Sequence, residues 1–258
     1  MIIVKHEAII NDIELIKYEY DHIGIKDFCY VEPSDTGNYL VIVHGHGSKA
    51  DQLYTREDVF NSWYPEIKKY GLGIINFDTQ GNGWMNKYVV WAMEKMIKYL
   101  KKAHNIKNTI FAGGSMGGTS MVIYALYHPE DIDGLIANCP ASNMTDYYYS
   151  IEHTDHPVLK EIRDTIKERY EGTPKESDMY KASNANEHPE VFTMPTFIAH
   201  GNADELIGFE YTEKLINNLK GKDNFNYKII ENGNHDSPIA LFPEELAWVC
   251  QKLNINKI

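Results

Sequence analysis

The sequence predicts an α/β protein with a mostly parallel, twisted central sheet and helices on both of its faces. Short apolar runs such as residues 38–45 (NYLVIVHG) are typical of strands that are buried on both sides. Segments with apolar residues at helical spacing separate these runs. Such alternation implies crossover connections between parallel strands. The length of 258 residues suits one large α/β domain, residues 1–258.

The expected elements follow in chain order. Strands at residues 2–10 and 13–20 flank the turn pair Asn11-Asp12, and an alternating segment, residues 26–33, ends at Pro33. Later strands are expected at residues 38–45, 72–78, 108–114, 132–140, 194–201 and 226–232. Helices are expected at residues 57–70, 87–104, 116–127, 209–220 and 239–253. This order predicts a strand-rich start followed by repeated strand–helix units.

One long interval interrupts that rhythm, between the strands expected at 132–140 and 194–201. It contains a tyrosine cluster, Tyr147, Tyr148 and Tyr149, followed by a helical stretch. In a compact α/β chain such an insertion usually covers a pocket. We therefore expect a cap over roughly residues 141–180, with the three tyrosines setting substrate specificity.

Composition excludes several classes of protein. The formal net charge of −12 disfavours a nucleic acid or an anionic membrane as partner. The three cysteines, Cys29, Cys139 and Cys250, form neither a disulfide framework nor a CxxC site, which fits a reducing compartment. The first residues are too polar for a signal peptide, and no run reaches the roughly 18 apolar residues of a membrane span. A cytoplasmic location is expected.

The sharpest motif is Gly113-Gly114-Ser115-Met116-Gly117, a G-x-S-x-G pattern between an apolar strand and a helix. That is the context in which the motif holds a nucleophilic serine at a strained turn. Glycine is needed at Gly113 and Gly117 because the chain approaches itself closely on either side of the serine. The pattern therefore predicts Ser115 as a catalytic nucleophile.

A serine hydroxyl needs a base to take its proton and an acid to orient that base. In this sheet architecture the acid and then the histidine follow the serine, each just past a later strand. Asp204 follows the strand at 194–201, and His235 follows the strand at 226–232. Glu205 and Asp236 are expected to be surface carboxylates, while His200 and His44 are expected to brace loops.

The segment His44-Gly45-His46-Gly47 allows two interpretations. As a turn with exposed amides, it would supply the His46 N–H to an oxyanion hole whose second donor is the Met116 N–H. As a metal site it would need the pattern H-x-H-x-D-H, but Ser48 and Lys49 stand where Asp and His are required. The oxyanion interpretation is favoured, with no metal expected.

Several segments together resemble the α/β-hydrolase superfamily, and within it the prolyl-oligopeptidase-like (S9-type) catalytic domain and its stand-alone esterase relatives. They are VHGHG, FDTQGNG, GGSMGG, YEGTPKESDMYKASNANEH, HGNADELI and GNHD. The resemblance implies an α/β-hydrolase fold, the triad Ser115, Asp204 and His235, and the His46 and Met116 amides as oxyanion donors. Gly208 and Gln80 replace a proline and an arginine of the family pattern, which weakens the peptidase implication more than the hydrolase one.

The sequence thus predicts a serine hydrolase that cleaves a small or medium carboxylic ester through an acyl-enzyme on Ser115. An S9-like peptidase acting on short peptides and a non-hydrolytic member of the fold are the alternatives. The expected partner is a small-molecule ester or amide substrate, with no nucleic acid, no membrane and no cofactor. Whether the protein forms a homodimer stays open.

Overall fold

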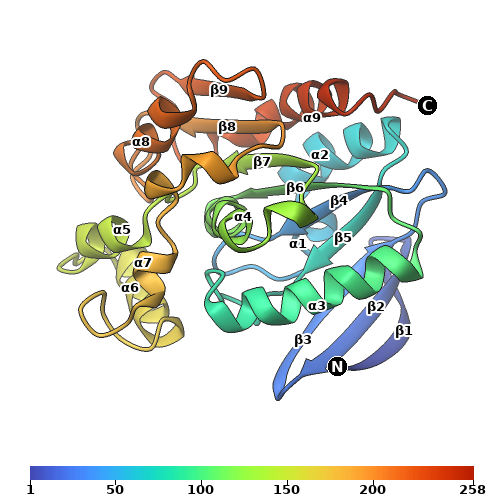
Figure 1. The fold of residues 1–258 in the computed structure, drawn as a ribbon, viewed down its shortest axis with the longest axis horizontal. Coiled ribbons are helices and arrows are strands. Elements are labelled where there is room, and N and C mark those ends of the chain that lie inside the picture. The colour runs from blue at the N-terminus through green and yellow to red at the C-terminus, as the bar shows by residue number, and fades with distance from the viewer.

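The computed structural model describes all 258 residues, which form one nine-stranded sheet of order β1-β2-β3-β5-β4-β6-β7-β8-β9 (Figure 1). The first three strands pair antiparallel, as does β3 with β5, and every pairing from β5 to β9 is parallel. The strands span Ile2–Ile10 (β1), Ile13–His22 (β2), Ile25–Glu32 (β3), Asn38–Val43 (β4), Gly73–Phe77 (β5), Asn108–Gly114 (β6), Gly134–Asn138 (β7), Thr196–Gly201 (β8) and Phe225–Ile230 (β9).

Helices cover both faces of this sheet. The helices α3 (Lys87–Ala103), α4 (Met116–Tyr127) and α8 (Glu210–Leu219) pack on one face, and α1 (Gln52–Thr55), α2 (Glu57–Lys69) and α9 (Phe242–Lys252) on the other. Alternate residues of a strand pack into the two hydrophobic cores on either face of the sheet. Val41 and Val43 pack into the core beneath α3, α4 and α8, and Leu40 and Ile42 pack into the core beneath α1, α2 and α9. This division follows from the period-two alternation of side chains along a strand. The mixed, mostly parallel sheet predicted from the sequence is confirmed.

The structure differs from the expected elements in two details. It contains a short helix, α1, that the sequence pattern does not predict, and it divides the helix expected at 239–253 into a 3₁₀ turn, Ser237–Leu241 (η4), and α9. Pro238 stands at the start of the first and Pro243 at the start of the second. Proline suits the first turn of a helix because it lacks the N–H that would be unpaired there.

The insertion between β7 and β8 forms a separate lobe beside the sheet (Figure 1). It holds α5 (Met144–Ile151), α6 (Pro157–Arg169) and α7 (Met179–Ala182), and two 3₁₀ turns, Ala185–Glu187 and Pro189–Val191, lead back to the sheet. The buried Tyr170 ties the lobe to the body, since its hydroxyl donates to the Trp84 carbonyl at 2.9 Å. The cap expected at roughly 141–180 corresponds to α5, α6 and the first residues of α7.

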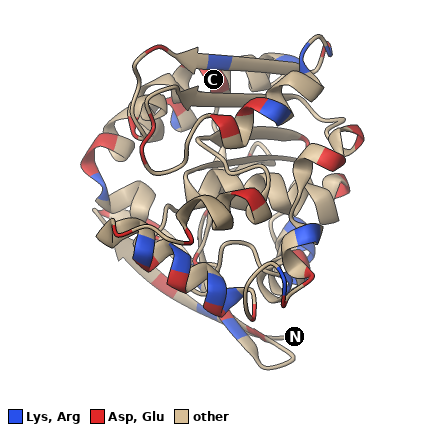
Figure 2. Cartoon of the chain, turned by 90° about the vertical axis from the view of Figure 1, so that its left-hand side faces the viewer, with Lys and Arg blue, Asp and Glu red and all other residues tan.

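Charged residues are spread over the molecular surface. Figure 2 shows acidic and basic residues interspersed along the helices and loops of one side. None of the helices combines the length and the apolar composition that crossing a bilayer requires.

Candidate active site

Ser115 lies at the sharp turn between β6 and α4. Its backbone has φ 60° and ψ −125°, a left-handed conformation that costs a non-glycine residue free energy and is typical of functional turns. Two hydrogen bonds hold this conformation. The Ser115 amide donates to the Asn138 carbonyl at 2.8 Å, and its carbonyl accepts from the Thr119 amide at 2.9 Å. The hydroxyl therefore stands at the start of α4, whose first amides point the same way.

The glycines around Ser115 permit a close approach of three backbones. A Cβ at Gly117 would lie 2.1 Å from the Val43 carbonyl oxygen, and one at Gly113 would lie 2.5 Å from the Gly117 carbonyl carbon. Any side chain at these positions would push α4 away from the sheet. The glycines of the G-x-S-x-G pattern are therefore required by packing, as the sequence predicts.

Asp204 follows β8 and is almost fully buried. Its Oδ2 lies 2.7 Å from His235 Nδ1 and 3.3 Å from His200 Nε2, while its Oδ1 accepts the amides of Leu206 and Ile207 at 2.8 and 3.0 Å. Burial raises the pKa of this carboxyl, but the hydrogen bonds from the two histidines and the amides outweigh that effect and hold the pKa well below its ordinary value. Asp204 is therefore an anion.

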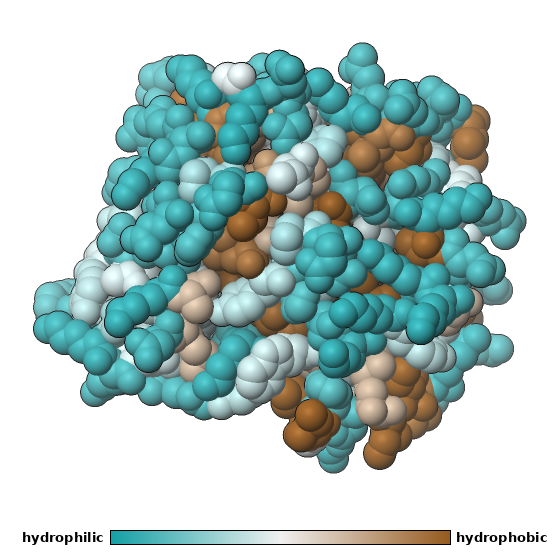
Figure 3. Space-filling view, in the orientation of Figure 1, coloured by the Kyte–Doolittle hydropathy of each residue, from teal (hydrophilic) through white to brown (hydrophobic).

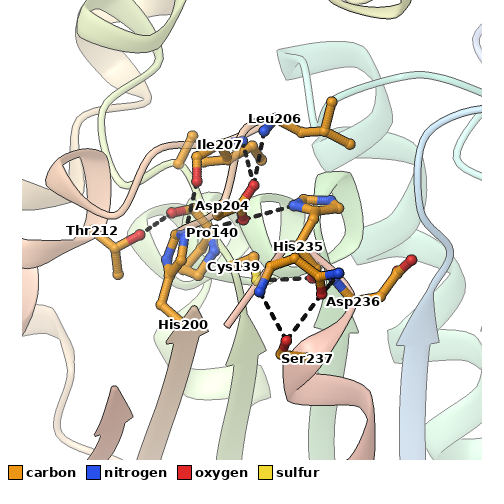
Figure 4. A network of polar contacts seen from close by, with 12 residues as sticks. Cys139, Pro140, His200, Asp204, Leu206, Ile207, Thr212, His235, Asp236 and Ser237 are labelled. Carbon is orange, nitrogen blue, oxygen red and sulfur yellow. Dashed lines mark hydrogen bonds and ion pairs between the residues drawn. The ribbon is translucent and has the colours of Figure 1, made fainter. Parts of the chain in front are cut away.

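His235 lies in the loop after β9 and faces Asp204 (Figure 4). Because a carboxylate only accepts, His235 Nδ1 carries the proton and Nε2 is free to act as a base. The loop is held by a tight turn in which Ser237 Oγ accepts the Asn234 amide and donates to Asn234 Oδ1, each at 2.9 Å. The Cys139 thiol also donates to the His235 carbonyl at 3.2 Å.

The loop after β4 forms a β-turn from Gly45 to Ser48. The Ser48 amide donates to the Gly45 carbonyl at 3.2 Å, and Gly47 takes the positive φ of 78° that a type II turn needs at its third position. The Gly45 and Gly47 amides are bound by Gln52 Oε1 and Asn82 Oδ1. The amide of His46, like that of Met116, has no acceptor within the chain and is free for a ligand.

The two histidine side chains of this loop have other partners. The ring nitrogens of His44 lie 2.7 and 2.8 Å from the carbonyls of Gly45 and Asp78, so this buried ring braces the loop. His46 Nδ1 accepts the Trp84 indole N–H at 3.1 Å, and Nε2 donates to Glu161 of α6 at 2.6 Å. Every ring nitrogen is engaged, and the two rings do not converge on a common point.

Ser115 and His235 line one cavity of about 120 Å³. No hydrogen bond joins the two side chains in this resting arrangement; in unliganded enzymes such bonds commonly form only with substrate. The cavity walls come mainly from the α1–α2 region and η4, among them Leu53, Trp63 and Ile239. Arg56 stands at its rim, bound in a fork to Asp58 and to Asp236 at 3.1 Å.

The expectation that the cap tyrosines set specificity is wrong for two of the three. Tyr147 and Tyr148 are buried, the first against Trp84 and the second against Tyr180, and no residue of the lobe lines the cavity. A tyrosine cluster carries no signal that separates a core from a pocket wall. The sequence does not predict Arg56 and Trp63 as site residues, because their positions depend on long-range contacts with Asp236 and Ile239.

A buried polar pair joins the cavity wall to α9. Asn138 Nδ2 donates to Glu245 Oε2 of α9 at 3.0 Å, and neither Asn138 Oδ1 nor Glu245 Oε1 has a partner. Burial raises the pKa of Glu245 to about 8, with the Asn138 hydrogen bond opposing it. The backbone carbonyl of Asn138 accepts the Ser115 amide, so this pair connects α9 to the turn that holds the serine.

The sheet, its covering helices and the turn at Ser115 together define the α/β-hydrolase fold. Solved structures of this fold resemble the chain over most of its length: Est1E from Butyrivibrio proteoclasticus (17% identity, TM-score 0.65, covering 92% of this chain and 97% of that one) and an S-formylglutathione hydrolase from Agrobacterium tumefaciens (15%, 0.64, 98% and 100%). Acetyl xylan esterase 1 from Thermoanaerobacterium sp. is similar too (11%, 0.69, 96% and 87%).

The chain belongs to the prolyl oligopeptidase family, peptidase family S9, whose profile matches residues 75–256. No curated protein matches the sequence. The family resemblance inferred from the motifs is thereby confirmed, and the chain is a hydrolase of the S9 family.

Proposed function

We propose that this protein is a serine carboxylesterase that cleaves small or medium esters through an acyl-enzyme on Ser115. The observation that carries the proposal is the arrangement around the cavity: an ionised Asp204 orients His235, and His235 and the strained Ser115 face the same space. Family membership and the esterases among the similar folds support a hydrolytic reaction.

The reaction would proceed in two steps, acylation of Ser115 and hydrolysis of the acyl-enzyme. Ser115 Oγ attacks the ester carbonyl while His235 Nε2 takes its proton, and the free amides of His46 and Met116 bind the oxyanion. The intermediate then collapses, the alcohol leaves with the proton from His235, and the acyl group stays on Ser115. Water, deprotonated by the same imidazole, releases the acid and restores the serine.

The cavity limits the acyl group that fits. Its volume of about 120 Å³ is similar to the roughly 150 Å³ that holds a benzene molecule in an apolar protein cavity. Apolar walls from Leu53, Val59 and Trp63 favour a short aliphatic chain. We therefore expect acetyl and butyryl esters to be cleaved faster than dodecanoyl esters.

The decisive test compares the wild-type protein with Ser115→Ala on p-nitrophenyl acetate and butyrate, with intact-mass detection of the acyl adduct. Loss of the serine should lower kcat by about 10⁴-fold or more and abolish the adduct. Activity that persists in the variant would contradict the proposal.

A peptidase of the same mechanism is the second candidate, because the family profile is that of peptidases. The same enzyme preparation should be offered aminoacyl and dipeptidyl p-nitroanilides. If these amides react faster than the esters after correction for intrinsic reactivity, the peptidase assignment replaces the esterase one.

A further inference from the structure

The edge strand β1 exposes apolar side chains to solvent on both faces of the sheet. Ile2, Val4 and Ile9 are 70%, 47% and 71% exposed, although β1 is nine residues long and pairs on one side only. In the space-filling view, apolar residues gather at the lower right, over the first strands (Figure 3). Proteins usually shorten or blunt such an edge because its unpaired backbone groups can bind another strand.

The sequence of β1, Ile2-Ile3-Val4-Lys5-His6-Glu7-Ala8-Ile9-Ile10, is complementary to its own reverse about His6. In an antiparallel pair of two copies centred on His6, Lys5 of each copy lies opposite Glu7 of the other. Opposite charges at directly facing positions stabilise a strand pair. His6 lies opposite His6 of the other copy, and the other positions place apolar residues opposite apolar residues.

The cores beneath the strand strengthen this register. Ile3 packs against the core on the α3 side of the sheet, while Ala8 and Ile10 pack against the core on the α2 side. In the pair centred on His6, each exposed residue meets one of these half-buried ones on the same face. Ile9 meets Ile3, Ile2 meets Ile10, and Val4 meets Ala8.

The neighbouring registers are less favourable. The two-fold axis of such a pair is perpendicular to the sheet, so side chains on one face of a copy lie on the same face of the dimer. Facing residues must therefore come from the same face of the strand, which requires the axis to pass through a residue and not between two residues. Centring on Lys5 places the two lysines opposite each other, and centring on Glu7 does the same with the two glutamates. Like charges that face directly are destabilising. The register centred on His6 alone combines paired charges with matched apolar residues.

From this self-complementarity we infer that the protein forms a two-fold dimer through β1, with an antiparallel strand pair centred on His6 and one sheet continuous across both copies. The partner is a second copy of this chain. This inference rests on the edge strand alone and is independent of the proposed function.

Charge reversal tests the register directly. Lys5→Glu should raise the dimer Kd roughly tenfold or more, because two ion pairs become two repulsive pairs. The double variant Lys5→Glu/Glu7→Lys restores both pairs and should recover the dimer. Lys26→Glu is the matched control, since it makes the same charge change on β3, away from the edge. Sedimentation equilibrium over a wide concentration range measures each Kd.

Cysteine cross-linking gives a second measurement. Only residue 6 lies opposite itself, so His6→Cys should form a disulfide-linked dimer on oxidation, whereas Val4→Cys and Ala8→Cys, on the same face, should not. The three native cysteines are buried and leave the background low. Far-UV circular dichroism and urea unfolding of every variant report that the chain is folded.

Three results would overturn the inference: a wild-type protein that stays monomeric at all concentrations, a dimer unaffected by Lys5→Glu, or cross-linking that is no better at residue 6 than at residues 4 and 8.

Discussion

The most unusual single residue is Glu245, a carboxyl group that is completely buried in α9 with one oxygen unpaired. Its pKa of about 8 means that folding keeps the proton on this group at neutral pH. An ionised carboxylate at this depth would be costly, since a single amide from Asn138 does not replace its hydration. Glu245 thus links the free energy of folding to pH at a position that supports the serine turn.

Glu245→Gln should therefore change how stability depends on pH. Between the ordinary carboxyl pKa of 4.5 and about 8, the native state holds a proton that the unfolded state has lost. Rising pH then lowers stability by up to about 1.4 kcal/mol per pH unit within this window, and the loss stops above it. The glutamine variant stays neutral and does not lose this stability. The difference in free energy of unfolding between the variant and the wild type should therefore shift by a few kcal/mol in favour of the variant between pH 5 and pH 8.

Urea unfolding at several pH values measures this difference. Glu213→Gln is the control, because it removes an exposed carboxyl on α8, on the other face of the sheet, and should leave the pH dependence as it is in the wild type. Parallel curves for wild type and Glu245→Gln would contradict the assignment of a neutral Glu245.

Individual residues could be predicted from the sequence only where a short motif or the order of the strands identifies them. The positions Ser115, Asp204 and His235 follow from motif and strand order, and the structure brings the last two into contact. Glu245 and Arg56 gave no signal, because their surroundings come from distant segments. A glutamate in an amphipathic helix normally reads as a solvent-facing side chain.

At the scale of elements, the unit β6–turn–α4 fixes the nucleophile through backbone contact alone. Helix α4 is buried almost throughout and begins directly against the carbonyl oxygen of Val43 at the end of β4. Room for this contact exists only because Gly117 has no side chain. The motif is therefore a packing motif as much as a chemical one.

Two alanine variants within the motif should behave differently. Gly117→Ala should destabilise the protein by about 3 kcal/mol, because its Cβ would stand 2.1 Å from a backbone oxygen that cannot move alone. Gly114→Ala should cost less than about 1 kcal/mol, since its nearest neighbour would be the Asn138 Cβ at 3.7 Å. Denaturant midpoints compare the two, and equal losses would show that close approach is not the cause.

The strands and long helices were predictable because each carries its own period, whereas the short helix α1 and the position of the lobe were not. Four residues are too few for a periodic signal. The lobe is placed by contacts such as Tyr170 with Trp84, which no local pattern encodes.

At the scale of the whole molecule, the cavity wall is also part of the core that joins α2 to α9. Trp63 stacks on Phe242 with ring centroids 4.0 Å apart, donates its indole N–H to the Ile239 carbonyl at 3.1 Å, and lines the cavity. Substrate size and stability therefore depend on the same side chain.

Trp63→Leu should enlarge the cavity and lower stability together. We expect the ratio of kcat/KM for hexanoate over acetate esters to rise, and the free energy of unfolding to fall by about 2–4 kcal/mol. Trp248→Leu is the matched control, since Trp248 packs on Phe197 outside the cavity and should alter stability without altering the ratio. An unchanged ratio in Trp63→Leu would show that this wall does not contact the acyl group.

The order of strands has a mechanical consequence for the base. Ser115 follows β6 and His235 follows β9, and with β7 and β8 between them the strand ends lie roughly 14 Å apart at ~4.8 Å per strand. The loop after β9 must therefore extend back across two strands. It is held by the hydrogen bonds of the Asn234–Ser237 turn and by the Cys139 thiol. The rigidity of this loop determines how precisely the His235 imidazole is positioned relative to the Ser115 hydroxyl. Substitutions in the loop should therefore change kcat by displacing the imidazole, although they alter none of the reacting groups.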